Sequence, residues 1–397
     1  LAAGIAAALA AHVPVAAGAL LALAGYGASL LLACAAWFAS FGAGWQRCPT
    51  PGAGWVLAGI LLLCLWGLCG WRRSWIPCAY VAALLACLSC NARSPAERLF
   101  QECREAFGGG GEGLWTRGAP PLRLTFLDVG EGDAIVIAFP DRRVWLLDAG
   151  GLALNPSREE DAYAFDIGEA VVSRYLWHEW TPRLDRVILS HADQDHAGGL
   201  QAVLRNFPVS EFRHAQRDPD AALRRVLRIA GDRKVPEGLL FAGREDSVGP
   251  VSVRVLHPPT DAAFRSSNET SVVLRLACGR FAALLTGDLE KAGEAALLAR
   301  TEELSGPLLK LAHHGSRFAT SEALLERVRP RWAVVSVGRN NPFRHPAREV
   351  MDRLRRHGVR PLLTMDEGAI TFETDGQRYR IRSHVRGVLE TGVLPKP

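Results

Sequence analysis

Charge is almost absent from the first ninety residues of this 397-residue chain, where only Arg47, Arg72 and Arg73 are charged. Apolar runs fill the same segment, at about 1–24, 26–45, 55–71 and 75–90. A helix of about 20 apolar residues crosses a bilayer, and indole side chains favour its interface. Trp45, Trp55, Trp71 and Trp75 lie at the ends of the runs. We therefore predict three or four transmembrane helices in residues 1–90.

The chain also lacks an initiating methionine and begins inside an apolar run, so we expect a fragment of a longer protein. A secretory signal is a single short apolar run with a basic start, unlike these consecutive runs. Arg72 and Arg73 precede the last run, and the positive-inside tendency places them in the cytoplasm and residue 100 onward outside. Arg93, Arg98 and Arg104, after that run, favour the opposite orientation.

Positive charge and cysteine are both scarce in the rest of the chain. The net charge is +5, and five arginines with one glutamate give residues 1–100 a charge of +4, which leaves +1 for residues 101–397. A strongly basic nucleic-acid binder is therefore excluded, and contact with a polyanion must use local patches or metal. Of nine cysteines, only Cys278 lies deep in this part, which excludes a disulfide framework there.

Residues 91–121 include the glycine- and proline-rich stretch FGGGGEGLWTRGAPP, which indicates a linker. From 122 to 385, β-rich runs alternate with helical patterns, and we interpret residues 386–397 as a tail. Both halves of this region pass from strands into strand–helix units. That order predicts an α/β fold in which two mixed sheets pack face to face with helices outside, a four-layer sandwich.

The stretch LSHADQDHAGGL, residues 189–200, follows an apolar strand and carries His191, Asp193, Asp195 and His196. Side chains two apart on an extended turn point the same way, so His191 with Asp193 can face one ion and Asp195 with His196 another. Zinc accepts imidazole and carboxylate ligands, and manganese accepts the same set with a bias towards carboxylate. The alternatives are a chance polar loop or a histidine that caps the next helix.

Two distant strands also end in ligand-type residues. LLTGD ends at Asp288, and LLKLAHHGS ends with His313 and His314. Taken alone, each is as readily a strand-end cap as a ligand. Together with the first cluster, they predict one site assembled at a sheet edge from distant parts of the sequence.

Six motifs occur in order: FLDVGEGDA, LLDAGG, HADQDHAGG, LLTGD, KLAHHGS and NPFRHP. In this order they resemble the metallo-β-lactamase-type domain of the ComEC-type DNA-uptake channels of competent bacteria, over about residues 122–382. The preceding apolar runs resemble the end of that family's membrane domain. The resemblance implies a four-layer αββα metallo-β-lactamase sandwich preceded by transmembrane helices.

The resemblance also implies a ligand set for two divalent ions, zinc or manganese. His191 and Asp193 would bind one ion, Asp195, His196 and His314 the other, and Asp288 would bridge them. Asp148 matches the acidic residue that supports the metal loop in this superfamily. Asp128 and Asp133 fall in a neighbouring turn, and the resemblance implies that they also support the site.

Two positions depart from the family pattern. Glu131 stands where glutamine is more usual. Asn268 stands at the place of the usual third histidine, with His257 as the nearest alternative. The first ion would then be weakly held, or completed by water or Asn268.

Two ions held close together activate a water and offset charge on phosphoryl oxygens, which suits phosphodiester hydrolysis. Asp193 and Asp195 would position the attacking group, and the phosphate contacts would come from Lys310, His313, Ser316, Arg344 and His345. Lys310 is as readily a solvated strand-edge lysine. The basic run of Arg224, Arg225, Arg228, Arg233 and Lys234 favours a solvated helix face over a guide for a DNA backbone.

The leading hypothesis is a multi-pass protein of the inner or plasma membrane that passes single-stranded DNA, while its outer (periplasmic or extracellular) domain degrades the other strand of a double-stranded substrate. Its partners would be DNA, membrane lipid and other DNA-uptake proteins, and an oligomer is compatible with this role. The alternatives are a membrane-tethered phosphoesterase with a non-nucleic-acid substrate, and a channel whose sandwich domain is not catalytic.

Overall fold

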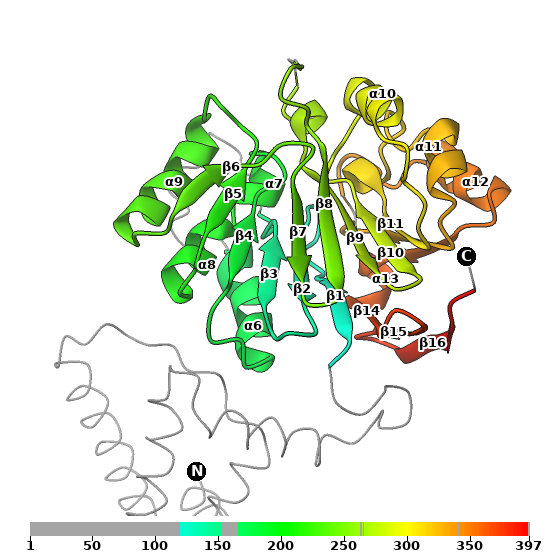
Figure 1. The fold of residues 1–397 in the computed structure, drawn as a ribbon, viewed down its shortest axis with the longest axis horizontal. Coiled ribbons are helices and arrows are strands. Elements are labelled where there is room, and N and C mark those ends of the chain that lie inside the picture. The colour runs from blue at the N-terminus through cyan, green and yellow to red at the C-terminus, as the bar shows by residue number, and fades with distance from the viewer. Residues whose placement is uncertain (1–119, 152–165, 263, 265, 340, 396–397) are drawn as a thin grey trace, which may run out of the picture. The chain divides into compact units, whose positions relative to one another are not determined.

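The computed structural model describes residues 120–151, 166–262, 264, 266–339 and 341–395 (Figure 1). The predicted transmembrane helices in residues 1–90 and nearly all of the predicted linker lie outside these residues. Within the described ranges, no helix combines the length and the apolar character needed to cross a membrane.

Two β-sheets form the centre of the described domain. The nine-stranded sheet has the order β16 (Gly387–Val393), β15 (Arg378–Ser383), β14 (Ile370–Thr374), β1 (Leu122–Phe126), β2 (Ile135–Ala138), β3 (Val144–Leu147), β4 (Arg186–Ile188), β5 (Phe212–His214) and β6 (Glu237–Leu239). The seven-stranded sheet has the order β13 (Arg360–Leu363), β12 (Trp332–Val335), β11 (Leu308–Lys310), β10 (Phe281–Leu285), β9 (Val273–Cys278), β8 (Val251–His257) and β7 (Glu245–Val248).

Helices cover the outer face of each sheet. Figure 1 shows α8 and α9 on one side of the paired sheets and α10, α11 and α12 on the other. The helices of the first layer are η2 (Gly168–Ser173), α6 (Arg174–His178), α7 (Gln194–Ala197), α8 (Leu200–Asn206) and α9 (Ala221–Asp232). The helices of the second layer are η3 (Asn268–Thr270), α10 (Lys291–Arg300), η4 (Ala312–Gly315), α11 (Glu322–Val328), α12 (Arg348–Arg356) and α13 (Thr364–Glu367).

The strands are apolar on both faces because each sheet is covered twice. In β12, Trp332 and Val334 pack between the two sheets, while Ala333 and Val335 pack against the helices of the second layer. A strand buried on both faces reads as a continuous apolar run rather than an alternating one. Three separate cores, one between the sheets and one under each helical layer, confirm the predicted four-layer α/β sandwich.

Each strand that leads to the predicted site is parallel to at least one neighbour. β3 pairs with β4 in one sheet, and β10 pairs with β11 and β11 with β12 in the other, all in parallel. Residues after the carboxyl ends of parallel strands meet at one edge of the sheet, where such folds place their ligands. Asp148, the 189–196 turn, Asp288 and the two histidines of η4 all follow such strands.

The ends of the domain differ from the sequence prediction in one place. Residues 386–397 were interpreted as a tail, but Gly387–Val393 form β16, which pairs antiparallel with β15. Glu390 explains its attachment, because its carboxylate accepts hydrogen bonds from Tyr379 and Trp332 and pairs with Arg331 and Arg360. The short strands β5, β6 and β7 were not predicted at all.

Candidate metal centre

Asp148 holds the turn after β4 from below. One of its carboxylate oxygens accepts a hydrogen bond from the Ser190 backbone N–H at 2.7 Å. The other accepts from the Ser190 hydroxyl at 2.6 Å and lies 2.9 Å from Nδ1 of His196. A carboxylate on one ring nitrogen of a histidine fixes the tautomer and leaves the other nitrogen to act as a metal ligand. Asp148 therefore aims Nε2 of His196 into the site.

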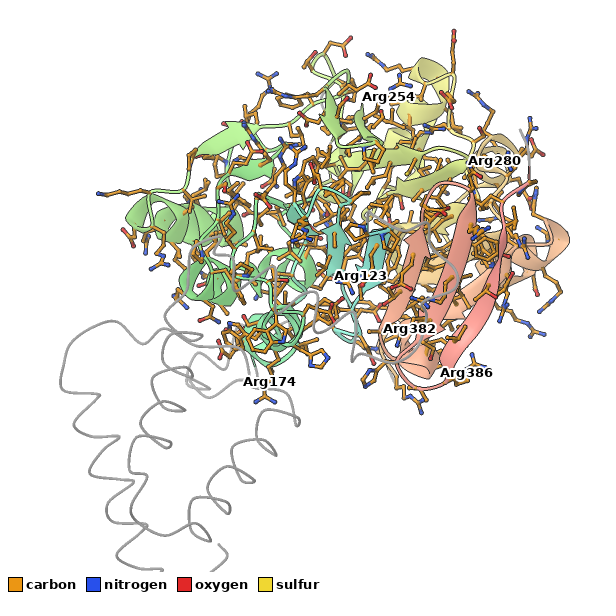
Figure 2. The ribbon with its side chains drawn as sticks, turned by 60° about the horizontal axis from the view of Figure 1, so that its bottom comes forward. Arg123, Arg174, Arg254, Arg280, Arg382 and Arg386 are labelled. Atoms are coloured by element: carbon orange, nitrogen blue, oxygen red, sulfur yellow. The ribbon has the colours of Figure 1, made fainter. Side chains whose placement is uncertain are left out.

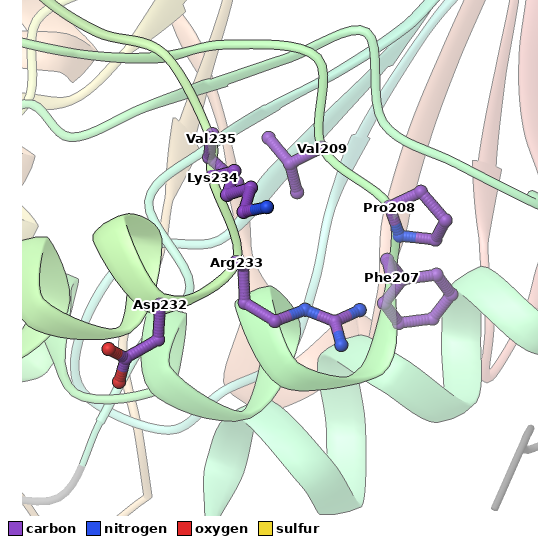
Figure 3. Close-up of a pocket in the computed structure, with 7 residues that line it drawn as sticks. All are labelled: Phe207, Pro208, Val209, Asp232, Arg233, Lys234 and Val235. Atoms are coloured by element: carbon purple, nitrogen blue, oxygen red, sulfur yellow. The ribbon is translucent and has the colours of Figure 1, made fainter. Parts of the chain in front are cut away.

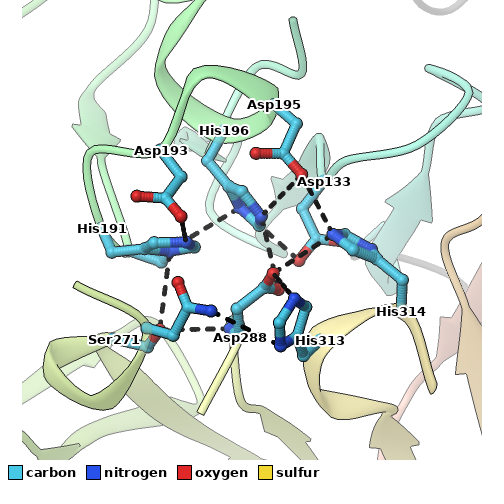
Figure 4. Close-up of polar contacts among 12 residues, drawn as sticks. Asp133, His191, Asp193, Asp195, His196, Ser271, Asp288, His313 and His314 are labelled. Carbon is cyan, nitrogen blue, oxygen red and sulfur yellow. Dashed lines mark hydrogen bonds and ion pairs between the residues drawn. The ribbon is translucent and has the colours of Figure 1, made fainter. Parts of the chain in front are cut away.

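Four side chains converge at the sheet edge, and their donor atoms all lie within 4.8 Å of one another: Asp195, His196, Asp288 and His314 (Figure 4). Nε2 of His314 lies 3.2 Å from Asp288 and 3.4 Å from Asp195. Nε2 of His196 lies 3.3 Å from Asp288 and 3.9 Å from Asp195. Ligand atoms 2.0–2.1 Å from a tetrahedral zinc stand about 3.3 Å apart, so the arrangement fits one ion.

The nitrogens of His196 and His314 that face the carboxylates are both Nε2, and neither makes a hydrogen bond in the described structure. Nδ1 of His314 donates to the Ser336 carbonyl at 2.8 Å, which turns Nε2 towards Asp288. Among the described residues, Nε2 of His196 and of His314 are buried and have no hydrogen-bond partner. Buried polar atoms are almost always satisfied, so two nitrogens that lack a hydrogen bond and face two carboxylates suit the binding of a cation.

The electrostatics of the cluster also favour a cation. Burial alone would raise the pKa of Asp288, but His314, His196 and Lys310 hold it well below its usual value. Asp195 follows the same pattern, with a pKa lowered by His196 and His314 against the effect of burial. Burial would lower the pKa of His314, yet Asp288 and Asp195 raise it to about 10. The carboxylates thus stabilise positive charge, and a bound metal would replace the histidine protons.

His191 and Asp193 form a second, more open group beside the first (Figure 4). Nε2 of His191 lies 3.7 Å from the Asp193 carboxylate and is buried without a hydrogen-bond partner in the described part of the chain. Nδ1 of His191 lies 3.0 Å from the Ser190 hydroxyl. Asp193 is oriented by Ser267, whose hydroxyl donates to it at 2.6 Å, while its side chain stays 43% exposed.

Neither alternative for the third histidine makes a hydrogen bond or ion pair with His191 or Asp193 in the described structure. Nδ1 of His257 contacts the Ser271 carbonyl at 3.0 Å and its ring packs on Phe264, so none of its described contacts is with a predicted ligand. Burial lowers the pKa of His257 to about 4. The Asn268 amide instead lies 3.5 Å from Nδ1 of His313.

His313 faces the predicted bridging carboxylate. Its Nε2 lies 3.8 Å from Asp288, and its Nδ1 lies 2.8 Å from the Glu290 carboxylate. His313 has a φ of 47°, and this left-handed backbone lets consecutive histidines present both rings to the site. His313 is therefore placed to contact either an ion or a substrate beside Asp288.

Lys310 lies beneath the cluster, and the predicted contact with substrate phosphate is wrong because its side chain is 0% exposed. Its ammonium pairs with Asp133, donates to the Gly287 carbonyl at 3.0 Å and lies 3.5 Å from Asp288. Burial would lower the pKa of Lys310, but Asp133 and Asp288 raise it, so the group stays charged. Lys310 therefore supports the Asp288 carboxylate from the protein side.

The 128–133 turn packs against the metal loop through its backbone. Gly132 has a φ of 123°, and a Cβ at this position would stand 2.1 Å from the Asp195 carbonyl oxygen. Only glycine fits this approach. Asp128, predicted as a support residue, instead accepts a hydrogen bond from Gly130 at the outer end of the turn and is exposed.

The remaining predicted substrate contacts lie on two loops at the mouth of the site. His345 pairs with Glu131 at 2.9 Å, so the unusual glutamate joins the 128–133 turn to the 338–346 loop. Ser316 is buried, and its hydroxyl accepts from the Phe318 N–H at 3.4 Å. Arg344 is exposed and its side chain has no partner among the described residues.

The basic run lies away from this mouth. Arg224, Arg225 and Arg228 are on α9, and Arg233 and Lys234 line a cleft of about 320 Å³ beside Phe207 and Pro208, which shares no lining residue with the metal cluster (Figure 3). The arginines marked in Figure 2 lie elsewhere: Arg123 and Arg382 on strands of the nine-stranded sheet, Arg254 on β8 of the other sheet, Arg174 on α6, and Arg280 and Arg386 in turns. All five cations of the run are exposed, as expected of a solvated helix face.

Sequence reasoning missed the residues that orient the ligands. Ser190, Ser267 and Glu290 each bond a predicted ligand or its neighbour, and the Ser336 carbonyl fixes His314. Ser190 directly precedes His191, which was an available signal. The other three lie on loops far from the ligand they orient, so no spacing in the sequence marks them.

Comparison with known proteins agrees with this fold. The model of the metallo-beta-lactamase superfamily matches residues 127–339, more than half of the chain. The chain belongs to the metallo-beta-lactamase superfamily. Members of this superfamily are usually metal-dependent hydrolases, and the described cluster is a candidate metal-binding site of that kind.

Two curated relatives are similar over most of the same region. ComE operon protein 3 of Bacillus subtilis (strain 168) is 32% identical over 270 residues, which is 65% of this chain and 33% of that protein. Competence protein ComA of Neisseria gonorrhoeae is 30% identical over 254 residues, 63% of this chain and 32% of that protein. The chain thus spans about a third of the length of these relatives. The solved metallo-beta-lactamase fold protein YhfI from Bacillus subtilis is 12% identical, with a TM-score of 0.40 over 64% of this chain and 100% of that one.

Proposed function

We propose that this chain is part of a DNA-uptake membrane protein whose metallo-β-lactamase domain hydrolyses DNA phosphodiester bonds with two divalent metal ions. The observation that carries the catalytic part is the cluster of Asp195, His196, Asp288 and His314, whose donor atoms fit one ion and face a second group beside it. The DNA-uptake part is supported by the ordered sequence motifs and by relatives that include a competence protein.

In this proposal, Asp195, His196, Asp288 and His314 hold one ion, and His191 and Asp193, with Asp288 between the two groups, hold the other. The ions would be zinc or manganese and, when bound, would polarise phosphoryl oxygens and lower the pKa of water for in-line attack. Side chains of the protein would orient the attacking group and bind the phosphate. Asp193 and Asp195 orient the attacking group, and His313, 24% exposed and held by Glu290, contacts the substrate phosphate.

Lys310 and Asp148 act through the ligands. Lys310 offsets the negative charge of Asp288 from beneath, and Asp148 keeps His196 in the tautomer that leaves Nε2 unprotonated. Arg344 and His345 border the same mouth, where we expect them to meet the phosphate backbone, whereas Ser316 is buried and is not a proposed contact. Preorganised groups of this kind contribute most where water is excluded, as it is around the buried cluster.

The wider setting is also a proposal. The predicted transmembrane helices in residues 1–90 would anchor the domain in the inner or plasma membrane, with the domain on the outer side. One strand of double-stranded DNA would then be degraded while the other passes inward, together with other DNA-uptake proteins and, where the protein assembles, further copies of itself.

The test offers labelled single- and double-stranded DNA to the full chain in detergent, loaded with manganese or zinc. Wild type should cleave DNA, Asp288→Ala should not, and Asp352→Asn, an exposed carboxylate on α12, should behave as wild type. No cleavage by wild type with either metal, or equal cleavage by Asp288→Ala, would refute the nuclease. Hydrolysis of a small phosphodiester without hydrolysis of DNA would favour the alternative phosphoesterase.

A further inference from the structure

Two phenylalanines at the mouth of the site are exposed to solvent. Among the phenylalanine, tyrosine and tryptophan side chains of the described residues, only Phe318 (52%) and Phe343 (61%) are largely exposed. Burying a phenyl ring contributes about 1.5–3 kcal/mol to stability, which neither residue gains in the folded domain. A single exposed apolar side chain is common on protein surfaces, so the position of these two rings decides their meaning.

Both rings lie on loops that border the metal ligands. The Phe343 ring stacks on His345, with centroids 5.7 Å apart and an interplanar angle of 21°, and the His345 ring lies 5.6 Å from that of His313. Phe318 lies four residues after His314, at the end of the turn that carries both η4 histidines. The two loops are joined, because the Ala347 N–H donates to the Gly315 carbonyl at 2.8 Å.

Cations flank both rings. Arg317 precedes Phe318 and Arg344 follows Phe343; both arginines are exposed, and neither side chain has a partner among the described residues. Lys291 adds a third charge, with its ammonium 5.2 Å from the Phe318 ring centroid. Each exposed ring thus has an adjacent unpaired cation, in a domain with little net positive charge elsewhere.

Alternating aromatic rings and cations are the pattern by which proteins hold unpaired nucleic-acid strands. The rings stack on bases, whatever their sequence, and the cations meet the phosphates between them. A base pair within a duplex already has both faces covered by its neighbours and cannot use such a ring. A small phosphoester has no flat base to stack.

We propose that Phe318 and Phe343 are base-stacking platforms that admit an unpaired DNA strand to the metal cluster, with Arg317 and Arg344 on its phosphates. This inference rests on the proposed function and narrows it, because the strand to be hydrolysed must be unpaired before it reaches the site. The platforms select single-stranded over double-stranded substrate by stacking rather than by base-specific hydrogen bonds.

The test measures binding of labelled oligomers to the metal-loaded full chain, with oligomer length checked on a gel after each titration. Three probes share one backbone length: a thymidine 12-mer, an abasic 12-mer and a 12-base-pair duplex. Wild type should bind the thymidine oligomer at least tenfold more tightly than the abasic one, and the duplex no more tightly than the abasic one. Removing one ring should lower the affinity about fivefold or more, because its stacking on a base is lost.

Phe318→Ala and Phe343→Ala should each weaken binding of the thymidine oligomer about fivefold or more and leave abasic binding within twofold, while tryptophan at either position should restore the difference. The matched control is Val385→Ala, at an exposed apolar residue on a different loop. It should leave the ratio of the thymidine-oligomer affinity to the abasic-oligomer affinity unchanged. Arg317→Ala and Arg344→Ala should weaken both oligomers by the same factor and reduce the salt dependence. Metal content of each variant checks that the site is still folded.

The two proposals fail separately. The proposal of stacking platforms would be overturned, even if DNA is cleaved, by either of two results. One is a wild type that binds the thymidine and abasic oligomers equally tightly, and the other is phenylalanine variants that weaken binding of both oligomers equally. If the preference for the thymidine over the abasic oligomer depends on both phenylalanines but the chain cleaves no DNA, the stacking platforms are supported and the nuclease is refuted.

Discussion

Replacing Lys310 by methionine should destabilise the domain strongly, although methionine fills nearly the same space. Lys310 is 0% exposed and Asp133 is 1% exposed, and the ammonium is also bonded to the Gly287 carbonyl. Removing one partner of a buried ion pair leaves the other charge uncompensated, at a cost of about 3–5 kcal/mol. Lys310→Met should therefore cost about that much, whereas the exposed Lys234→Met should cost less than about 0.5 kcal/mol.

Amide hydrogen exchange in the full chain measures this cost locally, with chelator present so that metal binding does not contribute. A loss of 3–5 kcal/mol accelerates exchange of the amides of β10 and β11 by roughly 10²–10³-fold or more. Adding Asp133→Asn to Lys310→Met should recover part of the loss, because the buried charge then disappears. If Lys310→Met exchanges within about fivefold of wild type, the ion pair does not support the site and the assignment of Lys310 is refuted.

Three further outcomes follow from single contacts. Gly132→Ala should lose metal binding, measured by metal analysis, because the new Cβ collides with the Asp195 carbonyl; metal content equal to wild type would contradict the close approach. Asp148→Asn should weaken metal affinity about 10–100-fold in a competitive chelator titration, because His196 loses its orienting carboxylate, and an unchanged affinity would rule this out. Glu390→Gln should increase exchange in β16 at pH 7, and this increase should shrink as the pH falls below about 4.3. Burial would raise the pKa of Glu390, but hydrogen bonds from Tyr379 and Trp332 and two nearby arginines lower it. The stabilisation by the Glu390 carboxylate is therefore present above the unfolded pKa of about 4.3 and is lost as the pH falls through the lower folded pKa. A difference in exchange that does not depend on pH would contradict this.

The ligand positions were predictable because they directly follow strongly apolar strands. HADQDH follows β4, Asp288 follows β10 and the η4 histidines follow β11, and parallel strands bring such ends together. The layer order was predictable for the same reason, since runs such as Trp332–Val335 are apolar on both faces. Local pattern and global fold agree in these segments.

Other features depended on contacts that the sequence does not mark. Lys310 looked like a solvated or phosphate-binding lysine because lysines are rarely buried, and only its pairing with the distant Asp133 makes burial possible. β6 and β7, with the sequences EGL and EDSV, carry charged residues and too few apolar positions for a period to be seen. Their strand conformation comes from pairing with β5 and β8.

The two halves of the metal centre differ in a way that bears on catalysis. Asp195, His196, Asp288 and His314 surround one position on several sides and are mostly buried, as in a closed site. In the proposed two-ion arrangement the other half would have fewer ligands, namely His191, Asp193 and a shared Asp288, with Asn268 where the superfamily pattern places a histidine. Catalytic metal sites keep an open position for water or substrate, whereas structural sites do not. In the proposed mechanism, the departure at Asn268 is therefore compatible with catalysis, because the more open half is the one that holds Asp193, whose side chain is 43% exposed.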